Sequence, residues 1–258
     1  MSLDLTDHEV RVRLARLTGG LYLAYIGAMI LADESGHIGR SSAQQLSAAI
    51  LTSGLSFRAG LVFALVSALL FALVAWGLYV LLRPVNKDLA LLFLLLNAVG
   101  VAIQCGSLLP LVSAMLQGDA GTHMQAFSAA QLAGLDSLSA STYKTVFVTA
   151  QLFFSAWLFP LGYLVYKSRC LPRFLGVLLL ADGVAVMIWF LQALLFPAYP
   201  AVSKRIVVVS FVAEFGLALW LLIKGVKEAP DAALPRTLRP SAGTARAVQQ
   251  AQRADAVS

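Results

Sequence analysis

Long uninterrupted apolar runs are the feature of this sequence that most limits its fold. Between Ala59 and Leu82 the chain has no Asp, Glu, Lys, Arg or His, and comparable runs recur as far as Ile223. A helix needs about 20 apolar residues, each rising 1.5 Å, to cross the roughly 30 Å hydrocarbon core of a bilayer. Only 12% of the residues are charged, against roughly 25% in soluble domains. This pattern excludes an ordinary soluble fold and is typical of a multi-pass membrane protein.

The predicted fold is all-α, a polytopic transmembrane helix bundle with six spans. A closed β-barrel would need alternating apolar and polar residues, and the run from Leu178 to Phe196 does not alternate. The predicted spans are Leu14–Ala32, Phe57–Leu82, Leu89–Leu116, Ser141–Tyr166, Phe174–Phe196 and Ile206–Ile223.

The distribution of basic residues predicts the orientation of these spans. Of the Lys and Arg residues, 14 fall on the side that holds both termini and 5 on the other side. Basic loops stay in the cytoplasm, so both termini are expected to be cytoplasmic. Residues 1–229 form the predicted transmembrane domain. Residues 230–258 lack apolar periodicity and are expected to be a disordered basic cytoplasmic tail.

The net charge of +6 has a membrane explanation, because the bases flank apolar spans. Membrane lipids are therefore the expected partners, and nucleic acid is excluded. Aromatic residues precede bases by four positions at the inner ends of three spans, as in Tyr163 and Lys167. An internal repeat of helix pairs or an aromatic belt with basic residues reaching the headgroups would each produce this pattern.

Two external connections are long enough to hold short helices. We predict them at Ser41–Leu51 and Thr122–Leu132, each with Ser or Thr as its N-cap. Leu46 and Ile50 give the first helix an apolar face that could rest on the membrane surface. These segments could cap the outer mouth of a pathway, or serve only as ordered connections between spans.

The candidate site consists of polar residues inside the predicted spans. Charged groups there cost about 2.5 to 3.5 kcal/mol at a helix centre. Counting 1.5 Å per residue from the cytoplasmic ends places Asp182 and Glu214 roughly 12 to 13 Å deep. Asn97 and Tyr25 fall at the same depth, and Gln104 and Gln151 fall in a second layer with Ser67, at about 22 Å. The predicted ligand- or proton-binding residues are Glu214, Asp182, Asn97, Gln104, Gln151 and Tyr25.

Each part of this candidate site has two interpretations. The polar stripes of the third and fourth spans, which include Asn97 and Gln151, can face each other across a water-lined path, or can hydrogen-bond and pack as ordinary helix interfaces. The two carboxyls can share a proton, as in proton- or cation-coupled transporters. A single neutral acid bonded to a helix carbonyl satisfies the same physics.

The chain contains no recognisable catalytic or metal-binding motif. His8, His37 and His123 are far apart in sequence, and no HExxH, GxSxG or glycine-rich phosphate loop is present. Two cysteines, Cys105 and Cys170, give no basis for a disulfide framework. We therefore expect no catalytic residues, no metal and no cofactor.

Three segments resemble a bacterial multi-pass membrane family catalogued as domain of unknown function 4386. They are Leu78–Leu92, Leu152–Leu180 and Glu214–Val226. The resemblance implies a helical protein of the bacterial inner membrane without an established activity. Positions that match the family pattern are Pro160, Gly162, Tyr163, Lys167, Pro172, Gly176 and Glu214. Asp182 departs from it, which makes Glu214 the better single candidate.

The function predicted from these observations is the binding or transport of a small solute or cation, with Glu214 providing a possible link to protons. The alternative is a non-catalytic membrane component that regulates or scaffolds a partner protein, and an intramembrane enzyme comes third. Transport predicts a cavity that reaches Glu214 from one side. Scaffolding predicts unpaired polar or small residues on the lipid-facing surface. The sequence does not define the oligomeric state.

Overall fold

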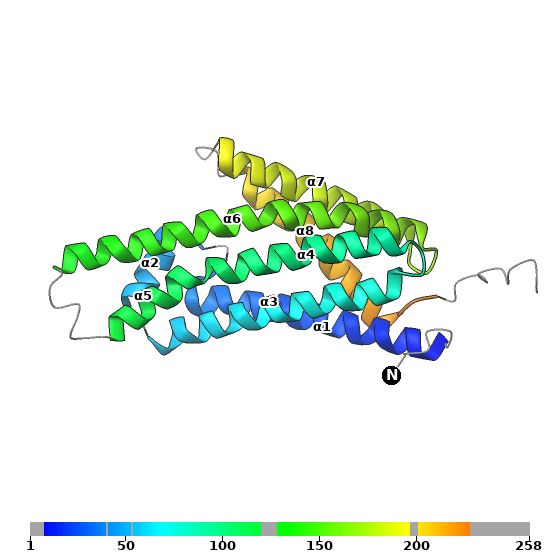
Figure 1. Cartoon of the computed structure of the whole chain (residues 1–258), viewed down its shortest axis with the longest axis horizontal. Helices are drawn as coiled ribbons and strands as arrows, with labels where there is room; N and C mark the ends of the chain where they lie inside the picture. Colours follow the sequence, from blue (N-terminus) through cyan, green and yellow to red (C-terminus); the bar gives the residue numbers. More distant parts are fainter. Residues whose placement is uncertain (1–7, 40, 53, 120–127, 197–200, 228–258) are drawn as a thin grey trace, which may run out of the picture. The chain divides into compact units, whose positions relative to one another are not determined.

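The computed structural model describes residues 8–39, 41–52, 54–119, 128–196 and 201–227, and all its regular elements there are helices (Figure 1). The tail at 230–258 lies outside the described residues. The helices are α1 (His8–Gly36), α2 (Ala43–Thr52), α3 (Leu55–Leu82), α4 (Lys87–Ser107), α5 (Leu109–Asp119), α6 (Ala129–Lys167), α7 (Arg173–Leu195) and α8 (Ala201–Ile223).

Six of these helices form the membrane bundle. Five described segments, α1, α3, α4 with α5, α6 and α7, are long and apolar enough to cross a membrane. The sixth, α8, has 23 residues, about 34 Å of helix at 1.5 Å per residue. Its apolar part is Val208–Ile223. The predicted all-α, six-span architecture is confirmed.

The spans pack in a closed ring. The order of contact is α1, α3, α4, α6, α7, α8 and back to α1, so neighbours in sequence are neighbours in space. Short connections between antiparallel helices produce this arrangement. Side chains from all six spans meet in the interior. Phe71 on α3 stacks on Tyr25 of α1, with ring centroids 4.4 Å apart, and meets the edge of Trp157 of α6 at 5.1 Å.

Glycines allow the ring to close tightly. A Cβ on Gly19 would lie 2.5 Å from the backbone nitrogen of Leu222, where α1 meets α8. One on Gly176 of α7 would lie 2.6 Å from the backbone nitrogen of Tyr166 on α6. No real Cβ fits at such distances, so the helix backbones touch at these points. This is the usual way in which membrane helices gain packing energy without a hydrophobic driving force.

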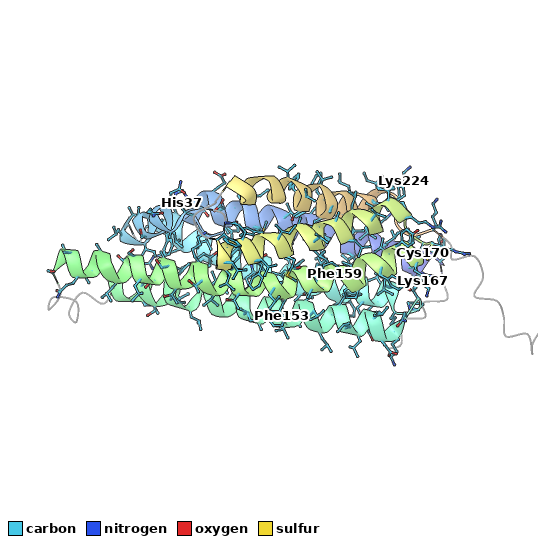
Figure 2. The ribbon with its side chains drawn as sticks, turned by 90° about the horizontal axis from the view of Figure 1, so that it is seen from above. His37, Phe153, Phe159, Lys167, Cys170 and Lys224 are labelled. Atoms are coloured by element: carbon cyan, nitrogen blue, oxygen red, sulfur yellow. The ribbon has the colours of Figure 1, made fainter. Side chains whose placement is uncertain are left out.

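Both ends of the described chain lie at the same end of the bundle. The backbone N–H of Lys227, after α8, donates to the carbonyl of Cys170 in the α6–α7 connection at 3.0 Å. The Arg11 guanidinium of α1 contacts the sulfur of Cys170 at 3.6 Å. Figure 2 shows Lys167, Cys170 and Lys224 at this end and His37 at the other. The basic asymmetry makes this the cytoplasmic end.

The first external helix is confirmed, with two corrections. This helix is α2, and its N-cap is Ser42 rather than Ser41. Ser42 Oγ accepts from the Gln45 N–H at 3.2 Å, and Gln45 Oε1 accepts from the Ser42 N–H at 2.9 Å. Leu46 and Ile50 are buried against α3, α5 and α6. The apolar face therefore rests on protein and not on the membrane surface.

The second external helix was predicted incorrectly where the structure describes it. The predicted start at Thr122 lies outside the described residues, and Ala129–Leu132 belong to the 39-residue helix α6. Ser128 caps α6, and its hydroxyl accepts from the Gln131 N–H at 3.3 Å. Ser128 and Gln131 form a capping box, which marks the start of a helix, and α6 then continues without a break to Lys167.

The third span is also not continuous, because α4 ends at Ser107 and α5 begins at Leu109. Pro110 has no N–H to donate and sits in the first turn of α5, where helices tolerate proline. The backbone turns at Leu108, whose carbonyl accepts from Leu111 and Val112 at 3.0 Å each.

Candidate functional site

Asp182 lies at the interface of α7 and α8 and is completely buried. The Ser210 hydroxyl of α8 donates a hydrogen bond to its Oδ1 atom. The second oxygen, Oδ2, is buried and has no hydrogen-bond partner among the described residues. None of the described Lys or Arg side chains forms an ion pair with Asp182. One half of this carboxyl is thus satisfied inside the bundle and the other half is not.

Glu214 follows Ser210 by one helical turn and faces a tyrosine of α1. The hydroxyl of Tyr22 lies within electrostatic reach of the Glu214 and Asp182 carboxyls. Tyr22 is fully buried, and no described atom makes a well-formed hydrogen bond to its hydroxyl. Both intramembrane carboxyls are therefore near one buried phenol. We call Tyr22, Asp182, Ser210 and Glu214 the carboxyl cluster.

Tyr25, the tyrosine expected at the depth of the carboxyls, has a different role. Its ring stacks on Phe71, and its hydroxyl contacts the sulfur of Met29 at 3.5 Å. Its ring centroid lies 5.9 Å from that of Tyr22. Tyr25 packs beside the carboxyl cluster, whereas Tyr22, which the depth estimate missed, reaches it. Thr18, Tyr22 and Tyr25 are spaced i, i+4 and i+7, and this helical face is the signal that could have identified Tyr22.

The three predicted amides, Asn97 of the first layer and Gln104 and Gln151 of the second, form no shared hydrogen-bond network in the described chain. Asn97 on α4 is completely buried, and neither its Oδ1 nor its Nδ2 has a hydrogen-bond partner in the described chain. The Gln151 amide donates to the Phe147 carbonyl of its own helix at 3.4 Å. Gln104 is half-buried. Within the described residues, no hydrogen bond links these amides to one another or to the carboxyl cluster.

The interpretation that the stripes of the third and fourth spans face each other is wrong for two members of the fourth. Ser155 on α6 donates to the Gly183 carbonyl of α7 at 2.8 Å. Gly162 packs against the backbone of Gly176, also on α7. In contrast, Gly100 of α4 does meet α6, against the ring of Phe154. Close packing and interhelical hydrogen bonding explain most of the α6 stripe.

The described residues contain no group of three or more His, Cys, Asp or Glu side chains that could hold a metal ion. Two carboxyls, a phenol and a hydroxyl can exchange a proton or accept hydrogen bonds from a small polar or cationic ligand. They offer no activated nucleophile. The chemistry that this cluster supports is therefore reversible binding and protonation.

A ring of apolar helices with polar groups held inside defines a multi-pass α-helical membrane protein. The chain belongs to the family described as Domain of unknown function (DUF4386), which it matches over residues 17–225. The predicted family resemblance is confirmed. A protein of Archaeoglobus fulgidus, described as an uncharacterized protein, is 32% identical over 154 residues, which cover 60% of this chain and 76% of that protein. No solved structure gives a significant match.

Proposed function

We propose that the protein binds or transports a small cationic solute, and that protons compete with this solute for the carboxyl cluster. The observation that carries the proposal is the free Oδ2 atom of Asp182, in a carboxyl that is fully buried between two membrane helices. A buried polar atom without a partner costs about 1 to 3 kcal/mol. A bound proton or a cationic ligand would remove that cost.

The neighbouring groups support a binding role over a purely structural one. A structural carboxyl is stabilised best when both of its oxygens are bonded, yet Ser210 satisfies only one oxygen of Asp182. The Tyr22 hydroxyl adds a second underused polar group beside the carboxyls. Polar groups that converge at membrane depth without full pairing are typical of ion and solute pathways.

A scaffolding role has less support. It predicts small-residue faces left open for a partner helix, and nothing lies within 4 Å of a Cβ on Gly27, Gly106 or Gly134. The glycines with the closest backbone approaches are already used within the chain. Gly19, Gly60 and Gly176 each lie against the backbone of a neighbouring helix. The basic asymmetry and the family resemblance lead us to place the protein in the bacterial inner membrane, with its basic end towards the cytoplasm.

The proposal is tested by ligand-induced stabilisation of the purified protein in nanodiscs. Tetramethylammonium and other small organic cations are screened at about pH 5 and about pH 8. These values lie on either side of the physiological pH range in which a proton-binding site would change its charge. A bound cation needs an ionised carboxyl, so it should raise the melting temperature more at the higher pH. Asp182→Asn and Glu214→Gln should abolish the difference. Ser67→Ala, whose hydroxyl bonds only to its own helix, is the control and should retain it.

A screen in which no cation stabilises the wild type more at high pH would contradict the proposal. Equal stabilisation of wild type and Asp182→Asn would place the ligand elsewhere. If both carboxyl variants are as stable as the wild type and respond to no ligand, the scaffolding alternative becomes the better account.

A further inference from the structure

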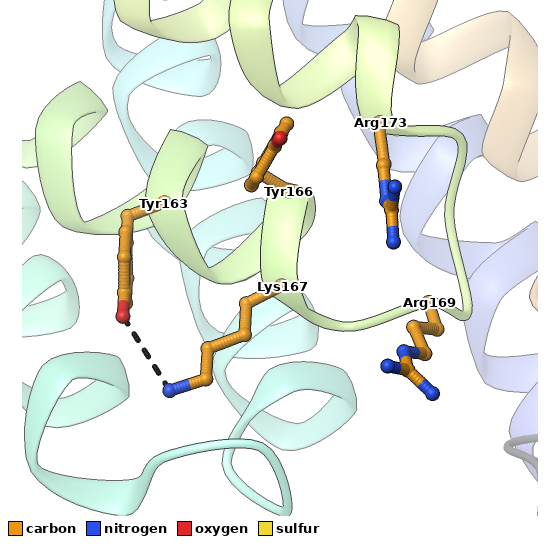
Figure 3. Close-up of a pocket in the computed structure, with 5 residues that line it drawn as sticks. All are labelled: Tyr163, Tyr166, Lys167, Arg169 and Arg173. Carbon is orange, nitrogen blue, oxygen red and sulfur yellow. Dashed lines mark hydrogen bonds between the residues drawn. The ribbon is translucent and has the colours of Figure 1, made fainter.

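A basic hollow lies at the cytoplasmic end of the bundle, where α6 ends and α7 begins. Its volume is about 270 Å³, and it is lined by Tyr163, Tyr166, Lys167, Arg169 and Arg173 (Figure 3). The Lys167 ammonium lies 5.6 Å from the ring centroid of Tyr163 and donates to its hydroxyl at 3.4 Å. The Arg173 guanidinium lies 5.8 Å from the ring centroid of Tyr166. Three cations thus surround one open space, and aromatic neighbours hold two of them, Lys167 and Arg173.

The positive charge of this hollow is not neutralised by the described part of the chain. The only ion pair among the described residues joins Arg13 and Glu9, both highly exposed on α1. No acidic side chain lines the hollow. Pro172 caps α7 without a side-chain hydrogen bond, so the partial positive charge at the N-terminus of α7 adds to that of the three bases.

The connection that carries Arg169 is anchored on both sides. Ser168, Cys170 and Leu171 are buried, and Cys170 bonds to Lys227 and Arg11 as described above. Arg169 is the exposed residue of this segment, in the left-handed region at φ 55°. A non-glycine residue adopts this conformation only at some cost. The turn fixes the backbone of Arg169 at the rim of the hollow before any ligand arrives, which reduces the backbone entropy lost on binding.

We propose that this hollow binds a phosphate group, supplied by the headgroup of an anionic phospholipid of the cytoplasmic leaflet. Arginine and lysine around a shared space are the usual recognition elements for phosphate. Tyrosines at the ends of spans lie at headgroup depth. Beyond the hollow, Phe174 and Val177 of α7 are 54% and 53% exposed, and they offer an apolar surface for the acyl chains. This surface favours a lipid over free phosphate, and the site is independent of the proposed function.

The test is native mass spectrometry of the full chain with equimolar phosphatidylglycerol and phosphatidylcholine. The wild type should retain phosphatidylglycerol preferentially. Combining Arg169→Gln with Arg173→Gln should lower the bound phosphatidylglycerol by about tenfold, because each base near a membrane contributes a several-fold gain in affinity for anionic lipid. The matched control combines Arg83→Gln with Lys87→Gln. It removes the same charge at the cytoplasmic end outside the hollow and should change binding less than about twofold.

Each outcome decides the proposal. Equal losses in the two double variants, or none in the hollow variant, would overturn it, since charge alone or another surface would then hold the lipid. Displacement of phosphatidylglycerol by millimolar inorganic phosphate would keep the phosphate site but assign it to a soluble ligand. If the Arg169 variant loses its monodisperse elution profile, Lys167→Gln tests the same hollow with the connection intact. It should lower binding about threefold, and an unchanged value would overturn the proposal.

Discussion

The hydroxyl of Ser210 on α8 donates a hydrogen bond to Oδ1 of Asp182 on α7. This bond links two adjacent spans, and Ser210 is the one described hydrogen-bond partner of the Asp182 carboxyl, which is fully buried. Glu214 lies one turn further along α8, and Tyr22 of α1 lies within electrostatic reach of both acids. Three helices that are adjacent in the ring thus contribute to one polar cluster.

Removing the Ser210 hydroxyl should destabilise the protein. Ser210→Ala leaves both oxygens of Asp182 without a described partner, and we expect a loss of about 1 to 2 kcal/mol in the free energy of unfolding. Ser67→Ala is the control: its buried hydroxyl bonds only to the Ala64 carbonyl of α3 at 2.8 Å, so its loss should cost under about 0.5 kcal/mol. Reversible unfolding in mixed micelles measures both values. Equal values would show that the Ser210–Asp182 bond adds nothing to stability.

The contact between α6 and α7 predicts a strong effect of one added methyl group. A Cβ on Gly176 would collide with the backbone of Tyr166, so Gly176→Ala must separate two helices, at a cost of roughly 1 to 3 kcal/mol. Nothing lies within 4 Å of a Cβ on Gly27 of α1. Gly27→Ala should therefore stabilise the protein by up to about 1 kcal/mol through helix propensity. Thermal melting of the two variants gives the comparison, and a stabilised Gly176→Ala would refute the described packing.

The outer end of the bundle is fixed by a lysine. The ammonium of Lys144 on α6 donates to the Gly39 carbonyl at 2.6 Å, and Asp33 accepts from the N–H of Ser41 at 3.0 Å. Lys144→Met should free the 37–42 connection and speed hydrogen exchange in α2 by about tenfold, with exchange in α7 unchanged. Uniform acceleration in both helices would indicate global destabilisation instead of local release.

The positions of the spans could be predicted because they depend on local composition. The predicted limits Phe57–Leu82 and Phe174–Phe196 lie within two residues of α3 and α7, since apolar length and flanking charge decide insertion. The break at Leu108 was harder to predict from the sequence. Pro110 is compatible with either a kinked span or a new helix. Leu108 and Leu111 pack in one buried apolar cluster with Leu46, Phe57 and Tyr143, and this packing decides between the two.

The composition of the carboxyl cluster could be predicted only in part. Depth along each helix identified Asp182 and Glu214, but it treated all spans as parallel and starting at one plane, and so selected Tyr25 in place of Tyr22. Helix rotation decides which of the two tyrosines reaches the acids. That rotation is determined by contacts such as Gly19 against Leu222, which no single helix reveals in its own sequence.

The most direct test of the account is infrared difference spectroscopy of the purified protein in lipid, titrated between about pH 5 and pH 8. We expect a protonated carboxyl band at low pH that is lost as the pH rises. Asp182 is buried and forms no ion pair with a described Lys or Arg, so its carboxyl should take up a proton at low pH and release it at high pH. Asp182→Asn combined with Glu214→Gln should remove that band, and Ser67→Ala should leave it unchanged. Carboxylates that stay ionised across the whole range in the wild type would contradict the central claim that this cluster exchanges protons.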